Sequence, residues 1–363
     1  MAPRAPGGPL VVLLGLGAAV SLASGLAGGL ARLGVLPASP ALAGPTALHG
    51  ALMVCGFFGY VIALERAAAL KWRWLWASPG LALGGSVAAA AQQPALAQGL
   101  WLLAAVVLSA AYAVVLRRDR GVHLAVEGAG ALAWAGGTSA WMAGAGLDTV
   151  VAWWCAFLVL TIAGERRELA RFTPLPRLAR QAFVAVLALQ AAGLLAMAAR
   201  PGPAAAATWW SSLAALAAWL LRFDLACRPR IARPGWARHT ARCLRLGYLW
   251  LAAAAAWGLW RAAQDLPLAG PGPLHALLLG FVFAMVFGHA PIVLPALLRR
   301  SIATPMALAA APVIAMSLGV ALRAAGDLLG SGPWRAAAAS LQALAIVGFA
   351  AVMVAGLRRP AAA

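Results

Sequence analysis

Five histidines are the residues of this chain whose type and placement can do chemistry. Two of them, His275 and His289, lie fourteen residues apart in the apolar stretch Leu274–Leu298. On an α-helix this spacing returns to within about 40° of the same face, roughly 21 Å further along the axis. Histidine is uncommon in a lipid-embedded helix, because hydrocarbon offers its ring nitrogens no partner. Two rings on one stripe therefore predict ligands for metal centres at two depths of a membrane.

Two other histidines match these two in depth. His49 opens an apolar segment that runs inward, as His275 does, so both are expected near the outer face of the membrane. His123 opens a segment that runs outward, and His289 lies about four turns along an inward-running helix, so both are expected towards the inner face. The sequence predicts an outer pair, His49 with His275, and a looser inner pair, His123 with His289.

The outer pair has the ligand set of a b-type haem. Such a haem takes two neutral imidazoles from facing helices, in a slot that excludes water. His49 and His275 meet that requirement if their helices are neighbours. The alternative for each is an ordinary hydrogen bond to lipid headgroups or loop carbonyls. The glycines that would admit the macrocycle, and the outer arginines that would pair with its propionates, are Gly50, Gly56, Gly59, Gly280, Arg261, Arg323 and Arg335.

The inner pair is placed for copper or a second haem. Met285 precedes His289 by one turn, so a thioether and an imidazole can share a copper ion. His123 has Glu127 one turn on, a carboxylate that can orient a ligand or pass protons. The competing interpretation is that His289 satisfies carbonyls that Pro291 leaves without a donor. Both interpretations stay open.

Composition indicates that lipid surrounds most of the chain. Its 363 residues are 64% hydrophobic and 10% charged, with a mean hydropathy of +0.87, more apolar than a soluble domain of this length requires. We expect residues 1–363 to form one transmembrane domain. The sequence predicts an all-α fold whose twelve membrane-spanning segments lie at about 10–34, 46–64, 74–91, 96–116, 123–144, 148–164, 181–199, 206–221, 243–260, 274–298, 303–322 and 334–357.

Basic residues give these segments a direction. A net charge of +19 would by itself suggest a nucleic-acid partner. With a cytoplasmic N-terminus, however, all but five of the 28 Lys and Arg residues fall on the cytoplasmic side, as in membrane proteins generally. We therefore expect both termini in the cytoplasm, membrane lipid as the main partner and no nucleic acid. The five exceptions are Arg32, Arg200, Arg261, Arg323 and Arg335.

Three features have ordinary explanations. The first apolar run, with Ala41-Leu42-Ala43 after it, imitates a secretory signal, but it is too long for one, so an uncleaved helix is expected. The four cysteines are scattered, and no disulfide framework is expected. His239 stands among arginines in the basic loop 222–242 and is expected to be an interfacial residue.

Two segments leave the membrane in the same way. Glu65 and Arg66 follow one segment, and Glu165 and Arg166 follow another, four helices later. We interpret each adjacent pair as a salt-bridged helix end. A spacing of four helices favours three groups of four over the six-plus-six repeat of many transporters.

With these residues the chain resembles subunit I of the haem–copper oxidases, in which histidines opening helices two and ten ligate a low-spin haem. The resemblance implies a similar twelve-helix bundle, with the haem near the outer face. The likeness is closer to the NnrS family, twelve-span proteins described as binding haem and copper and as protecting bacteria against nitric oxide stress. It rests on a second helix opened as His49-Gly50-x-x-Met53, and on His275-Ala276-Leu277-x-x-Gly280 with Met285 ten residues after the histidine.

Departures from the oxidase pattern limit what is expected. Residues 148–199 contain no histidine, and the chain has three tyrosines, so a three-imidazole copper site and proton-pumping oxygen reduction are not expected. The NnrS likeness implies a bacterial inner-membrane protein that handles nitric oxide or electrons through haem, together with a redox partner. The sequence assigns no catalytic residue. Two rivals remain, a cofactor-free transporter in which His289, His123 and Glu127 relay protons, and an assembly factor for a respiratory complex.

Overall fold

The computed structural model describes residues 8–170, 173–228, 235–298 and 300–358. In these ranges the fold is all-α, apart from a two-residue antiparallel pairing of β1 (Ser301–Ile302) with β2 (Leu357–Arg358). The helices of more than twenty residues are α1 (Gly8–Arg32), α6 (Pro94–Arg118), α7 (Val122–Met142), α8 (Leu147–Leu169), α9 (Arg177–Ala199), α10 (Pro203–Phe223), α11 (Trp236–Ala263), α14 (Met306–Leu328) and α15 (Gly332–Gly356).

Two further long helices are composite, because each changes its hydrogen-bonding pattern along its length. The first, called the His49 helix, consists of α2 (Ala43–Ala47), α3 (His49–Ala51), η2 (Leu52–Phe58) and α4 (Gly59–Leu70). The second, called the His275 helix, consists of α12 (Pro271–His275), η6 (Ala276–Val282) and α13 (Phe283–Leu298). The remaining helices are η1 (Pro40–Leu42), η3 (Arg73–Trp76), α5 (Ala77–Ala90) and η4 (Leu225–Cys227).

Each of the twelve predicted apolar segments overlaps one of the long helices, the composite helices or α5. Eight of the described helices are long and apolar enough to cross a membrane. The outer surfaces of α6, α9 and α15 expose large apolar side chains such as Leu103, Leu195 and Leu344. Exposure of this kind is stable in lipid and unfavourable in water. The chain is therefore a polytopic membrane protein.

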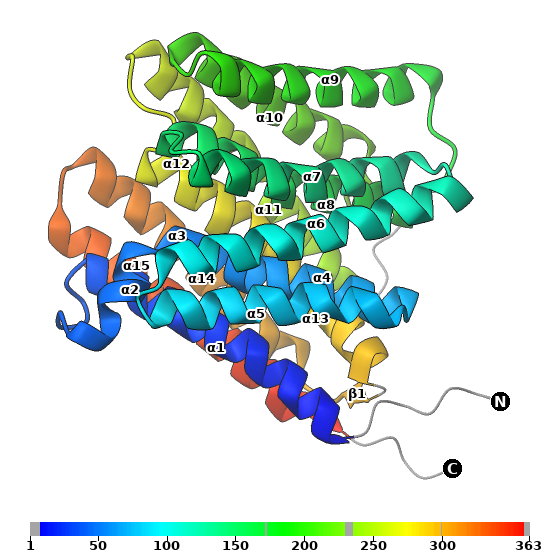
Figure 1. The fold of residues 1–363 in the computed structure, drawn as a ribbon. Coiled ribbons are helices and arrows are strands. Elements are labelled where there is room, and N and C mark those ends of the chain that lie inside the picture. The colour runs from blue at the N-terminus through cyan, green and yellow to red at the C-terminus, as the bar shows by residue number, and fades with distance from the viewer. Residues whose placement is uncertain (1–7, 171–172, 229–234, 299, 359–363) are drawn as a thin grey trace.

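Helices that follow one another in sequence pack side by side along most of the chain, from α5 through α8 and from α9 through α11 (Figure 1). The bundle closes where α1 contacts α15, so the first and last described helices are neighbours. The His49 helix and α8 are mostly buried and occupy the centre. We call the end of the bundle at which α1 ends the outer end, and the end at which α1 begins the inner end.

The largest boundary difference from the sequence prediction is at α11. This helix begins at Trp236, seven residues before the expected start at 243, and it takes in much of the predicted basic loop. Arginines lowered the apparent hydrophobicity of this turn, although its other face carries Thr240 and Cys243, which are buried. All four cysteines of the chain are free thiols.

Candidate functional site

The two outer histidines each stand directly before a π-helical segment. His49 begins α3, which leads into the seven-residue π-helix η2, and His275 ends α12, which leads into the seven-residue π-helix η6. A π-turn widens the helix and is found preferentially at functional sites. No single residue in the sequence signals these turns, so they could not be predicted from it.

The two π-helical segments meet through phenylalanines. Phe57 of η2 stacks on Phe283, the first residue of α13, with ring centroids 6.2 Å apart and planes 8° apart. Phe58 meets the same ring edge-on at 5.3 Å. These contacts make the His49 helix and the His275 helix neighbours, which is the arrangement that a shared ligand requires.

The imidazole of His49 is held against α1. Its Nδ1 lies 2.7 Å from the carbonyl oxygen of Gly25. A Cβ on Gly29 would lie 2.7 Å from Cε1 of the ring, which is closer than real Cβ contacts come. Because a carbonyl oxygen only accepts, Nδ1 must carry the hydrogen, and Nε2 keeps the lone pair that can bind a metal.

His275 reaches the same tautomer by a different route. Its Nδ1 donates to the carbonyl oxygen of Pro271, one turn earlier, at 2.6 Å. Among the described residues, no hydrogen bond is made to Nε2 of either His49 or His275. Metal-bound histidines characteristically donate their other ring nitrogen to a carbonyl or carboxylate in this way. The pair thus presents two neutral imidazoles with available Nε2 atoms.

Positive charge surrounds this pair. Arg323, Arg32 and the ring of His49 all act electrostatically on His275. Arg323 is buried and donates from Nε to Asp327 at 3.1 Å, and Arg335 pairs with the same carboxylate at 3.4 Å. Arg323 therefore already has a carboxylate partner within the protein. Its remaining N–H groups are the ones that can serve a bound anion.

The structure changes the expected set of outer arginines. Arg32, which was expected only to be one of the few arginines on the outer side, acts electrostatically on both outer histidines. Arg261 instead lies in the last turn of α11, where it donates to the carbonyl of Pro267 at 3.3 Å and packs on Gly270. Its local role is to hold the loop after α11.

Three of the four glycines expected to admit a macrocycle serve helix packing instead. A Cβ on Gly56 would lie 2.5 Å from Oγ of Ser86, and a Cβ on Gly59 or Gly280 would lie 2.6 Å from an indole. The indoles are those of Trp134 and Trp250. Gly50 alone of the four has open space beside it. The histidines therefore fit the ligand set of a haem, whereas these glycines do not make the space for one.

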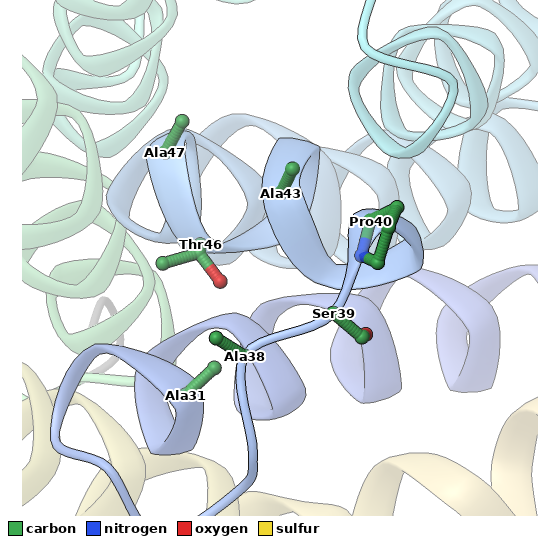
Figure 2. A pocket seen from close by; sticks show the side chains of 7 residues that line it. All are labelled: Ala31, Ala38, Ser39, Pro40, Ala43, Thr46 and Ala47. Atoms are coloured by element: carbon green, nitrogen blue, oxygen red, sulfur yellow. The ribbon is translucent and has the colours of Figure 1, made fainter.

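An apolar pocket of about 560 Å³ opens at the outer end, beside the helix that carries His49 (Figure 2). Thr46, one turn before His49, points its hydroxyl into the space between α1 and α2 (Figure 2). Small side chains without titratable groups line the pocket, so it suits an apolar group and supplies no ligand atoms of its own. The lining residues are Ala31, Ala38, Ser39, Pro40, Ala43, Thr46 and Ala47.

His289, at the inner end, has both ring nitrogens occupied. Nδ1 donates to the carbonyl of Met285 at 3.0 Å, and Nε2 lies 3.3 Å from Nη1 of Arg166, which can only donate. Arg166 is itself buried in a two-pronged ion pair with Asp224, at 2.9 and 3.0 Å. The lone pair of His289 is therefore already used by a protein cation.

The predicted inner metal site is not assembled in the described residues. The methyl end of Met285 packs against Gly247 of α11, and no hydrogen bond joins His289 to His123. No three His, Cys, Asp or Glu side chains of the described residues gather closely enough to hold a metal ion. The copper or second-haem hypothesis for His289, Met285 and His123 thus has no geometric support.

His239 was expected at the membrane interface but is buried in α11. It makes the hydrogen bond to a proline-freed carbonyl that the sequence suggested for His289. Its Nε2 lies 3.1 Å from the carbonyl oxygen of Phe287, the acceptor that Pro291 leaves without an amide donor. Thr240 donates to the next carbonyl, that of Gly288, at 2.7 Å. His239 is therefore a structural residue at the proline site of α13.

Glu127 pairs with residues other than His123. Its Oε2 accepts from Nη2 of Arg66 at 2.7 Å and from the hydroxyl of Tyr112 at 3.0 Å. The two Glu-Arg pairs at the helix ends likewise do not pair internally, since Arg66 pairs with Glu127 on α7 and Arg166 pairs with Asp224, directly after α10. We call these groups the inner polar layer: Arg66, Tyr112, Glu127, Glu165, Arg166, Asp224, Tyr248 and His289.

One family model matches almost the whole chain, residues 10–358, and its description is "Domain of unknown function (DUF8744)". The chain belongs to this family. No curated protein and no solved structure matches it. The features of this DUF8744 chain that bear on function are therefore its own: two histidines with available Nε2 atoms at the outer end, and a buried charged layer at the inner end.

Proposed function

We propose that this protein is a bacterial inner-membrane haem protein, in which His49 and His275 ligate one b-type haem. In this proposal the eleven long helices and α5 all span the membrane, giving twelve spans as in haem–copper oxidase subunit I, and both termini lie in the cytoplasm. The haem would supply one-electron redox chemistry and, as the NnrS likeness implies, would bind nitric oxide, which would have to displace one of the two histidines. Its partner would be a redox protein or a small electron carrier.

One observation carries the proposal. Two imidazoles from neighbouring helices each donate Nδ1–H to a backbone carbonyl, so each keeps an Nε2 lone pair. The two rings are close enough for His49 to act electrostatically on His275. Neutral imidazoles with fixed orientation are what a bis-histidine haem requires. The residues that would hold the haem are thus His49 and His275. Arg323 and Arg32 both act electrostatically on His275, so these two arginines would pair with the haem propionates.

The absorption spectrum of the detergent-purified protein tests this function. Reduction with dithionite is expected to produce the α band of a b-type haem, and His49→Ala or His275→Ala is expected to abolish it. His289→Ala is the matched control, because that ring has both nitrogens engaged and its loss should leave the spectrum unchanged. A colourless, folded wild-type protein would contradict the haem proposal.

The nitric oxide part has its own test. Nitric oxide added to the reduced protein is expected to shift the haem spectrum, with the shift absent when haem is absent. An unchanged spectrum would remove the nitric oxide role and leave electron transfer as the function of the haem.

A second candidate function is favoured by the inner polar layer. Charged side chains inside a membrane protein are costly and mark ion or proton pathways more often than stabilising contacts. A cofactor-free transporter would use this layer and would not need His49 or His275. The same two alanine variants separate the candidates, because a transporter keeps its activity when they are made.

A further inference from the structure

The feature of the inner polar layer that the haem proposal does not use is Glu127. Its side chain is fully buried between α4, α6 and α8, and Gly164 makes the space for it, since a Cβ there would collide with Cγ of Glu127. Both hydrogen bonds to the carboxyl go to Oε2. Its other oxygen, Oε1, is buried and has no hydrogen-bond partner among the described residues.

Burying a carboxylate oxygen in this position without a hydrogen-bond donor is energetically unfavourable. Burying a charged oxygen without a donor costs several kcal/mol, so such an atom characteristically holds a proton or a bound ion. A metal ion is disfavoured, because no three His, Cys, Asp or Glu side chains of the described residues gather closely enough to hold one. A proton needs only the one oxygen.

The charges around Glu127 also favour a proton. Among the described residues Arg66 is the one cation that contacts the carboxyl, and Tyr112 contributes only a neutral donor. Arg166, the neighbouring cation on α8, is already paired with Asp224. The charged or titratable groups that act on Glu127 or lie one turn from it on its own helix are Glu65, Arg66, Tyr112, His123, Glu165 and Glu168. Leaving Glu168 aside, three carboxyls, those of Glu65, Glu127 and Glu165, act on one another around Arg66, which is the condition under which neighbouring carboxyls retain protons.

We propose that Glu127 is an intramembrane proton-binding site, whose Oε1 exchanges a proton with the inner side of the membrane through the half-buried carboxyl of Glu165. Binding forms one O–H bond on Oε1 and takes the proton from a hydronium ion, leaving water. Nothing is oxidised or reduced in this step. Protonation makes the carboxyl neutral, so the ion pair with Arg66 becomes a hydrogen bond from the guanidinium to the carbonyl oxygen Oε2, which holds the carboxyl while the proton binds and leaves.

This inference does not rest on haem, because none of its residues belongs to the His49 and His275 site. It assigns a ligand, the proton, to the inner end of the bundle. It also assigns Arg66 and Tyr112 as positioning residues that act through the carboxyl of Glu127.

Infrared difference spectroscopy of the full-length protein in lipid nanodiscs tests the proposal. A protonated carboxyl has a C=O stretching band separate from that of a carboxylate. The wild-type protein is expected to show such a band at neutral pH, to lose it reversibly at alkaline pH, and to shift it in heavy water. Glu127→Gln is expected to remove this band, with an intensity that corresponds to one carboxyl group. Asp265→Asn, which changes an exposed carboxyl in the turn after α11, is the matched control and is expected to keep the band.

Tyr112→Phe adds a readout that a purely structural role of Glu127 would not move. It removes the hydroxyl that donates to Oε2, so the frequency of the same band is expected to shift while the band remains. Exchange of choline chloride for sodium chloride is expected to leave the band unchanged. The proposal is overturned if the wild-type protein has no protonated-carboxyl band at neutral pH, if the band survives in Glu127→Gln, or if sodium ions abolish it.

Discussion

His275 and His289 lie on one composite helix and make the same local hydrogen bond, yet they end in opposite chemical states. Each donates Nδ1–H to the carbonyl four residues earlier, that of Pro271 or of Met285. At the outer end no described residue donates to Nε2 of His275, whereas at the inner end Arg166 occupies Nε2 of His289. The local bond fixes the tautomer in both cases, and the surroundings decide whether the lone pair is available.

The two ends of the bundle also differ in how their charges are balanced. At the outer end Arg323 and Arg335 share the single carboxylate of Asp327. At the inner end Arg66 and Arg166 each have a buried carboxylate of their own, that of Glu127 and that of Asp224. The outer end therefore has cationic capacity left for an anion, and the inner end has carboxyl oxygens left for a proton. This difference makes the outer end the candidate for a cofactor and the inner end the candidate for proton exchange.

The largest stability effect is expected from breaking the inner ion pair. Asp224→Ala leaves Arg166 buried without its carboxylate, which costs about 3–5 kcal/mol of unfolding free energy. The outer counterpart, Arg335→Gln, removes a partly exposed arginine and is expected to cost less than about 1 kcal/mol. Titration with sodium dodecyl sulfate in mixed micelles measures both. Equal costs at the two ends would contradict the contrast drawn between them.

A smaller effect is expected at the proline site of α13. His239→Ala leaves the carbonyl of Phe287 without a donor and is expected to cost about 1–3 kcal/mol. Pro291→Ala restores a backbone N–H that can reach the same carbonyl, so the double variant should recover much of the loss. The same micelle titration closes this double-mutant cycle. Strictly additive costs would mean that His239 does not serve this carbonyl.

An effect on ligand binding rather than on stability is expected at the outer histidine, and it rests on the haem proposal. Gly29→Ala places a methyl group against the ring of His49 and is expected to weaken haem binding about tenfold, or ~1.4 kcal/mol. Gly50→Ala is the matched control, since nothing lies within 4 Å of the added Cβ. Haem titration of the haem-free variants measures the difference. The predicted role of α1 in holding His49 is lost if both variants bind haem equally.

The sequence predicted the helices well, because hydrophobic runs of this length have few alternatives to helical structure in lipid. Each of the twelve expected segments overlaps a helix, and the all-α class is confirmed. The boundary of α11 was misplaced because arginines on one face concealed the buried face that carries Thr240 and Cys243. The π-helical turns after His49 and His275 were not foreseen, since they depend on packing between helices far apart in the chain.

Contacts of the polar residues were predicted less well than the helices that carry them. Glu127 was paired with His123 from their spacing, and the structure pairs it with Arg66 and Tyr112 from two other helices. Pro291 was correctly recognised as leaving a carbonyl without a donor. The residue that donates to that carbonyl, which belongs to Phe287, is His239, 48 positions away in the sequence. Spacing along a helix identifies which side chains share a face, and it carries no information on which helix lies opposite.

The amino-acid sequence by itself determined that this chain is helical, apolar and basic, and it determined which of its histidines lie on long apolar helices. Those properties follow from local composition and periodicity, which the chain carries wherever its helices pack. Only the tertiary structure decided which imidazoles keep a lone pair, because the partners of His49 and His289 come from residues 24 and 123 positions away. The outer pair is distinguished from the inner histidine by those long-range contacts alone.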